Sequence, residues 1–312
     1  MAKSVLRSEI WIYKQKFNYQ HAKKLIDDIM KDEICNILDE ANFFEQRGYN
    51  ETSSQIVSLA KAVDNGQVTS VKGILDAVIK IGESFKLEFE NANPTGKDYR
   101  RKCYSQTQLI VFAGLIAVDK QQTPPPEYLL ALLKKMNQRD EYVNSLSKSL
   151  PDLFQKEIRT SEESLKMFRD ACTIYEQAID GIFSSAVKIL YFLMEKMGVE
   201  MPKSNEAGTV WDIWHNFEKA NVEIPVFLEG WPEKSSIKDA ITHSQNEYDP
   251  ILDRVHFVSK NNAGKITYES LDSMTFSDFF AIWMQIGDAV DCLRYSMRLY
   301  GIFQSLVIAS SP

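Results

Sequence analysis

Long apolar stripes with a helical period run through most of this sequence. A clear example lies between residues 71 and 89, where the large apolar side chains share one helix face: Val71, Ile74, Leu75, Val78, Ile81, Phe85 and Phe89. Similar stripes cover residues 165–193 and 279–297. Only 13 Gly and 10 Pro interrupt the 312 residues, which favours long helices over a sandwich or a barrel. We therefore predict an all-α protein built from multi-helix bundles.

Two proline-bearing segments divide the chain. Thr123-Pro124-Pro125-Pro126 is predicted to end a helix that begins near Asp98, because proline cannot continue a helix. Ser149-Leu150-Pro151 is a second break. Since 312 residues are too many for one ordinary core, we predict two domains. These are an N-terminal helical domain of unassigned function at residues 1–150 and a second helical domain at residues 151–312.

The segment before the last helix has the pattern of a β-hairpin. Residues 254–258 alternate between polar and apolar side chains, residues 261–264 (Asn-Asn-Ala-Gly) form a turn signal, and residues 265–268 can return antiparallel. Thr275 and Asp278 then offer caps for a long final helix. The sequence therefore predicts a short β-hairpin insertion between the last two helices.

Charge is unevenly distributed along the chain. The formal net charge is −7, and residues 1–150 carry 21 Lys/Arg against 19 Asp/Glu, whereas residues 151–312 carry 15 against 24. A strongly acidic half binds nucleic acid poorly, because phosphate contacts supply most of that affinity. Nucleic-acid binding would need a local basic site. The densest candidate, interleaved with Tyr99 and Tyr104, is Lys97, Arg100, Arg101 and Lys102, although a solvated helix start is the simpler explanation.

Cysteine usage and the N-terminus favour a cytoplasmic protein. The four cysteines stand singly with no CxxC pair, so we expect buried thiols in a reducing compartment: Cys35, Cys103, Cys172 and Cys292.

No two histidines have metal-ligand spacing, and no glycine-rich phosphate loop is present, so we expect neither metal nor cofactor. The apolar stretches near residues 181–193 and 276–286 are shorter than a membrane-spanning helix requires, and no membrane anchor is expected.

A short motif near residue 240 carries the best functional clue. A long apolar helix and a tryptophan-bearing helix precede the segment Lys238-Asp239-Ala240-Ile241-Thr242-His243, and the hairpin and the final helix follow it. Ser235 or Ser236 is predicted to cap the short helix that runs into His243. Residues five apart on a helix lie about 140° apart, so Lys238 and His243 converge only if His243 lies just past the helix end.

This order of elements resembles the HEPN superfamily over about residues 160–300. The family motif is an arginine, a polar residue and, after four to six intervening positions, a histidine; here Lys238 replaces the arginine, Asp239 is the polar residue and His243 the histidine. The resemblance implies a metal-independent endoribonuclease of a microbial defence or toxin–antitoxin system. His243 would act as general base or acid, Lys238 would contact the phosphate, and Asp239 would orient one of them.

The substitution at Lys238 leaves a second interpretation open. Lysine keeps the positive charge but lacks the planar fork with which arginine binds phosphate, so catalysis could be weakened or lost. The alternative is a non-catalytic HEPN-like scaffold that binds a protein or nucleic-acid partner, with His243 merely capping its helix. The resemblance also implies a homodimer through the C-terminal helical domain. The N-terminal half is a candidate binding site for a protein partner, and RNA is the candidate substrate.

Overall fold

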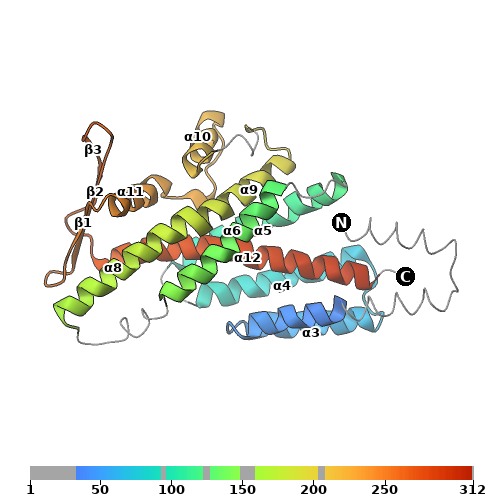
Figure 1. Ribbon diagram of the computed structural model, residues 1–312. Coiled ribbons are helices and arrows are strands. Elements are labelled where there is room, and N and C mark those ends of the chain that lie inside the picture. The colour runs from blue at the N-terminus through green and yellow to red at the C-terminus, as the bar shows by residue number, and fades with distance from the viewer. Residues whose placement is uncertain (1–32, 93–95, 122–126, 148–158, 203–207, 311–312) are drawn as a thin grey trace. The chain divides into compact units, whose positions relative to one another are not determined.

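The computed structural model is mostly helical, with one small antiparallel sheet near the C-terminus (Figure 1). This confirms the predicted all-α class and the hairpin insertion between the last two helices. The structure describes residues 33–92, 96–121, 127–147, 159–202 and 208–310. The breaks expected at Thr123–Pro126 and at Ser149–Pro151 lie outside these described residues.

The chain forms two compact units. One contains the described residues up to Gln121 together with those from Cys292 onward, and the other contains the described residues from Glu127 to Asp291. The last helix, α12 (Phe276–Ala309), contributes its first part to the second unit and its remainder to the first.

The first unit is a helical bundle. Its members are a helical segment at residues 33–45, α3 (Asn50–Asp64), α4 (Val71–Asn91), α5 (Lys97–Gln121) and residues 292–309 of α12. Ser70 caps α4, because its hydroxyl accepts a hydrogen bond of 3.1 Å from the Gly73 N–H. The Glu88 carboxylate of α4 accepts hydrogen bonds from the N–H groups of Glu51 (3.0 Å) and Thr52 (2.9 Å), which satisfies the otherwise open start of α3.

The core of the first unit is aromatic. Phe85 is fully buried, and its ring lies 4.5 Å from that of Tyr295 and 4.9 Å from those of Tyr49 and Tyr104, between centroids. The rings come from α4, α5, α12 and the start of α3, so one cluster joins elements that are far apart in sequence.

Helices α5 and α12 run side by side in the same direction within the first unit. The rings of Phe112 and Tyr300 meet edge to face, with their centroids 5.4 Å apart. Two turns after Phe112, Asp119 accepts hydrogen bonds from the Tyr300 hydroxyl (2.6 Å) and from the amide of Gln304 (2.7 Å), one turn after Tyr300. Burial, and then the hydrogen bond to Asp119, raises the pKa of Tyr300 above its ordinary value.

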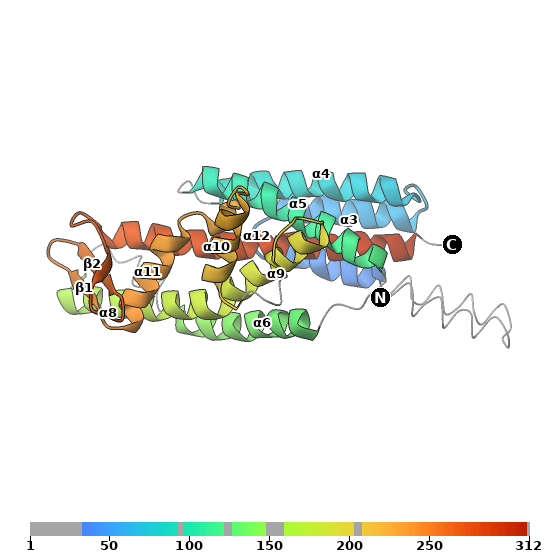
Figure 2. The ribbon, with the colours of Figure 1, turned by 90° about the horizontal axis from the view of Figure 1, so that it is seen from above.

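The second unit is built around one long helical rod. The rod consists of α8 (Ser161–Gln177), the π-helix η1 (Ala178–Phe183) and α9 (Ser184–Lys196). Around it lie α6 (Glu127–Ser147), α10 (Val210–Ala220), the 3₁₀ turn η3 (Val226–Leu228), α11 (Trp231–Thr242) and the first part of α12. Figure 2 shows α6 lying alongside this rod, which it contacts over all three parts.

A π-helix replaces regular α-helix around Gly181. The Ser184 N–H reaches back to the Ile179 carbonyl, and the Ser185 hydroxyl donates to the Gly181 carbonyl at 2.7 Å. A Cβ on Gly181 would lie 2.5 Å from Cγ of Arg139. The missing side chain therefore lets α6 approach the rod closely.

The rod also has the dimensions of a membrane span. Among the described residues, Ser161–Lys196 is long and apolar enough to cross a bilayer by length and composition. Because 78% of its most apolar window is buried inside the protein, this is weak evidence, which the core helix of a soluble protein gives equally well.

The sheet has three antiparallel strands in the order β1-β2-β3. Strands β2 (Arg254–Lys260) and β3 (Ile266–Glu269) are the predicted hairpin, whereas β1 (Asn246–Asp249) was not anticipated. In β2 the side chains alternate, and Val255 and Phe257 are buried. Phe257 packs within 5.1 Å of Phe279 at the start of α12, so the sheet is fixed to the helical core through one face.

The ends of three helices follow from packing and capping. Helix α6 extends to Ser147, and its Arg139 packs on Gly181. Helix α8 is capped by Thr160 in a capping box with Glu163. Helix α11 begins one turn before the predicted serine caps, because Gly230 adopts a left-handed φ of 67° directly before Trp231-Pro232.

Candidate functional site

Helix α11 holds the motif residues and is tied to its neighbours on both sides. The Ser235 hydroxyl, which was expected to cap this helix, instead accepts a hydrogen bond of 2.9 Å from the indole of Trp211 in α10. His243 follows the last helical residue, with φ −95° and ψ 11°, and its N–H bonds to the Asp239 carbonyl at 3.0 Å. His243 therefore lies just past the helix end, as convergence with Lys238 would require.

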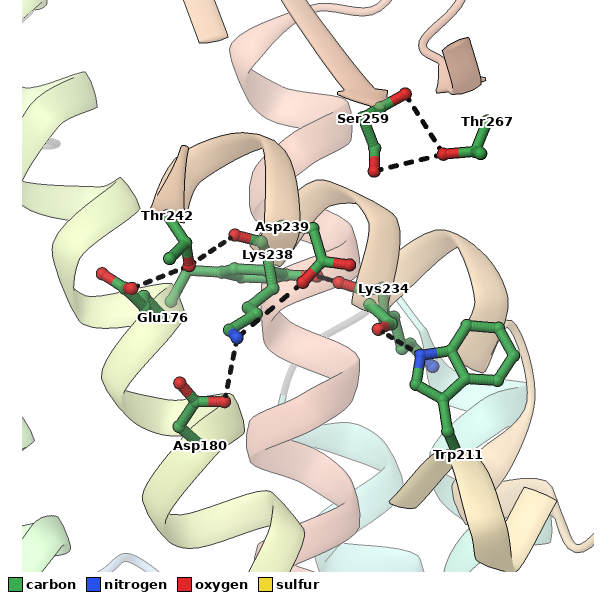
Figure 3. Close-up of polar contacts among 11 residues, drawn as sticks. Glu176, Asp180, Trp211, Lys234, Lys238, Asp239, Thr242, Ser259 and Thr267 are labelled. Carbon is green, nitrogen blue, oxygen red and sulfur yellow. Dashed lines mark hydrogen bonds and ion pairs between the residues drawn. The ribbon is translucent and has the colours of Figure 1, made fainter. Parts of the chain in front are cut away.

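The Lys238 side chain is engaged by carboxylates (Figure 3). Its Nζ lies 3.4 Å from Oδ1 of Asp180 in η1 and 3.8 Å from Oδ1 of Asp239. The Lys238 side chain is 21% exposed and that of Asp180 is 58% exposed, so the pair lies at the protein surface between α11 and the rod.

A third carboxylate lies one turn away on the rod. The Thr242 hydroxyl donates to Oε1 of Glu176 at 2.8 Å and also approaches the Lys238 carbonyl at 3.0 Å. Figure 3 shows both side chains of this pair beside the Lys238–Asp180 pair. Two carboxylates thus pair with the Lys238 ammonium group and a third lies one turn away, so the local field is negative.

His243 is exposed to solvent, and in the described part of the chain its side chain makes no hydrogen bond or ion pair. The structure brings Lys238 and Asp239 together but gives no contact between either of these side chains and the His243 ring within the described residues. The three motif residues therefore occupy one end of one helix without forming a hydrogen-bonded catalytic set.

Two charged residues near the motif were missed by sequence reasoning. Lys234 is buried, donates from Nζ to the Glu229 carbonyl, and its own carbonyl accepts a hydrogen bond of 2.9 Å from the Tyr175 hydroxyl. Nothing in the sequence distinguishes Lys234 from a solvated helix lysine. Asp180 could have been found, because it is a lone acid inside the apolar run of residues 178–183.

Burial and a nearby carboxylate raise the pKa values of two tyrosines beside α11. Burial, and then the charge of Glu233, raises the pKa of Tyr175 well above its ordinary value. Burial also raises the pKa of Tyr268, whose hydroxyl donates to Oε1 of Glu233 at 3.3 Å. Both tyrosines are therefore neutral hydrogen-bond donors at physiological pH.

The basic cluster at the start of α5 does not form one open cationic face. Its predicted members are Lys97, Arg100, Arg101 and Lys102. Arg100 is buried, with its guanidinium 5.5 Å from the ring centroid of Phe89. Arg101 pairs with Glu90 (3.5 Å) and Asp98 (2.9 Å). The two lysines are exposed, so the charge that reaches solvent is smaller than the sequence suggests.

The cysteines are all free, and three of them are buried as expected. The prediction was wrong for Cys35, which is exposed because it falls on the outer side of the helical segment at residues 33–45. Burial raises the pKa of the Cys172 thiol. Within the described ranges, no group of three His, Cys, Asp or Glu side chains is arranged to hold a metal ion.

Comparisons with known proteins do not assign this chain. No protein-family model matches the sequence, and neither the curated proteins nor the solved structures give a significant match.

Proposed function

We propose that this chain is a HEPN-like helical module that binds a protein partner without cleaving RNA. The observation that carries the proposal is the engagement of Lys238 by carboxylates, with Nζ 3.4 Å from Asp180 and 3.8 Å from Asp239. In a nuclease, the residue at this position stabilises negative charge on a phosphate. Here its charge is already compensated.

The ion pair itself is a small obstacle to RNA binding. Because Asp180 is largely exposed, breaking the pair would cost at most about 1 kcal/mol. The larger obstacle is the charge that remains: a phosphate that approached Lys238 would meet Asp180 and Asp239, with Glu176 one turn away on the rod. Each unit-charge repulsion near 4 Å is worth about 1 kcal/mol in water and about 4 kcal/mol at an effective dielectric constant of about 20. One lysine without the bidentate geometry of arginine does not offset three carboxylates.

The second candidate function is a metal-independent ribonuclease of a microbial defence or toxin–antitoxin system. It is favoured by His243, whose exposed imidazole stands just past the end of α11 at the histidine position of the HEPN-like motif. In this scheme His243 would accept the proton of a ribose hydroxyl, Lys238 would contact the phosphate and Asp239 would orient one of them. A homodimer through residues 151–312 would complete such a site.

Incubation of the full chain with total RNA and with tRNA, in the presence of a chelator, tests the proposal. His243→Ala is run beside the matched control His215→Ala, which removes another exposed histidine from α10. We expect no cleavage by any of the three proteins. Cleavage by the wild type and the control that disappears in His243→Ala would replace the binding proposal with the nuclease. Size-exclusion chromatography with light scattering on the same samples tests the homodimer.

A double variant sharpens the distinction. Asp180→Asn with Lys238→Arg removes the facing carboxylate and restores the arginine of the motif. A nuclease weakened by its lysine should gain activity in this variant, whereas a binding module should remain inactive.

A further inference from the structure

Three aliphatic side chains project into solvent at one end of the small sheet. Ile251 is 85% exposed, Leu252 67% and Leu271 75%. Ile251 and Leu252 form the turn between β1 and β2, and Leu271 follows β3. We call these three residues the tip surface.

Backbone hydrogen bonds place the two segments of the tip surface at the same end of β2. The Ser270 N–H bonds to the Phe257 carbonyl at 3.0 Å, and the Val255 N–H bonds to the Met274 carbonyl at 2.9 Å. The chain after β3 therefore continues antiparallel to the first half of β2. This path places Leu271 near the N-terminal end of β2, directly after the turn that contains Ile251 and Leu252.

The turn that displays these side chains is held in place. Oδ1 of Asp249 accepts hydrogen bonds from the N–H groups of Ile251 (2.8 Å) and Leu252 (3.1 Å). The Tyr248 hydroxyl donates to Asp253 at 3.0 Å. The aliphatic side chains are thus presented on an ordered frame, which reduces the entropy that a binding partner would have to remove.

The rim of the tip surface is acidic. Asp249, Asp253 and Asp272 are exposed at this end of the sheet, where Arg254 donates to the Asp272 carbonyl and Arg159 lies close enough to Tyr248 to act on its hydroxyl electrostatically. Exposed aliphatic groups beside carboxylates complement a segment that combines apolar and basic side chains. A second copy of this chain meeting the same surface across a two-fold axis would bring carboxylates against carboxylates. RNA and anionic lipid are disfavoured for the same reason.

We propose that the tip surface docks a basic amphipathic helix of another protein. The aliphatic face of that helix would cover Ile251, Leu252 and Leu271, and its lysines or arginines would meet the three aspartates. This inference rests on the proposed function and specifies the surface and the chemistry of its partner.

Binding of two synthetic peptides to the full chain tests the proposal. One is an amphipathic helix of leucine and lysine, and the other has the same apolar face with glutamate in place of lysine. By fluorescence anisotropy we expect the Leu/Lys peptide to bind, more weakly as salt increases, and the Leu/Glu peptide to bind at least about tenfold more weakly.

Two variants locate the binding. Leu252→Ser with Leu271→Ser should weaken the Leu/Lys peptide by about tenfold or more. The matched control is Ile266→Ser, which removes another exposed aliphatic group (49% exposed) at the opposite end of the sheet, beside Lys260 and Lys265. It should leave the affinity unchanged. Circular dichroism melting curves confirm that all variants remain folded.

Several outcomes would overturn the inference. These are no binding of the Leu/Lys peptide, equal binding of both peptides, or an affinity that the tip variant leaves intact. A wild-type dimer that dissociates only in the tip variant would assign the surface to a second copy of the chain. RNA cleavage that depends on His243 would overturn the proposed function separately, because the cleavage assay does not involve the tip surface.

Discussion

Asp180 of the π-helix and Lys238 of α11 form an ion pair, with Oδ1 and Nζ 3.4 Å apart. This pair connects the π-helical segment of the long rod to the helix that carries the candidate motif. Because it compensates the positive charge of Lys238, it is the first contact to test.

Replacing Asp180 with asparagine should change stability only slightly. The side chain is 58% exposed, so we expect the free energy of unfolding in urea to fall by less than about 1 kcal/mol. The effect should shrink as salt screens the wild-type pair. A loss of several kcal/mol that persists in high salt would show that the pair is far less solvated than its exposure indicates.

Gly181→Ala should destabilise the second unit. The new Cβ would lie 2.5 Å from Cγ and 2.8 Å from Cβ of Arg139, so α6 or the rod must shift. We expect a loss of about 1–3 kcal/mol in urea unfolding. The matched control is Gly287→Ala in α12, where a Cβ meets nothing within 4 Å. That variant should be neutral or stabilising by up to about 1 kcal/mol, and equal effects at the two glycines would contradict the close approach.

Phe85→Ala should be among the most damaging single changes in the first unit. Its ring is fully buried and lies within 5.6 Å of Phe44 as well as close to Tyr295. Removal should cost about 3–5 kcal/mol. Leu87→Ala, two residues along the same helix and 57% exposed, should cost less than about 0.5 kcal/mol. Chemical denaturation of both variants measures the difference, and a tolerated Phe85→Ala would mean that the aromatic cluster is not a tight core.

Asp278 should contribute stability that depends on pH. Hydrogen bonds from the Thr275 N–H and hydroxyl hold the pKa of this carboxyl below its ordinary value. Since the folded-state pKa is depressed, the contribution is present above the unfolded-state value of about 3.9 and is lost as the pH falls through the folded-state value. Asp278→Asn should therefore be less stable than wild type at neutral pH, by up to about 1 kcal/mol, and the difference should close in acid.

Urea unfolding of Asp278→Asn at neutral pH and below about pH 3 checks this expectation. The control is Asp76→Asn, which changes an exposed aspartate of α4. A stability difference at Asp278 that is the same at both pH values would show that the cap acts through shape and not through charge.

Part of the candidate site could be predicted from the sequence. The short helix that runs into His243 and the later strands β2 and β3 were predicted, because a helical segment and an alternating segment are visible in neighbouring residues. The partners of Lys238 were not predicted. Asp180 is 58 positions away, and only the packing of α11 against the rod brings the two side chains together.

Local signals in the sequence specify the kind and approximate extent of most elements. The stripe from Val71 to Phe89 specified α4, Ser70 and Thr275 capped their helices, and the turn at residues 261–264 joined β2 to β3. These signals are local, since caps and hydrophobic periods depend on residues within one or two turns.

Which elements meet depends on tertiary packing. That packing aligns Phe112 and Asp119 of α5 with Tyr300 of α12 and places Asp180 of the π-helix beside Lys238. These outcomes depend on how buried side chains from distant segments fill space together, and no local pattern specifies that arrangement.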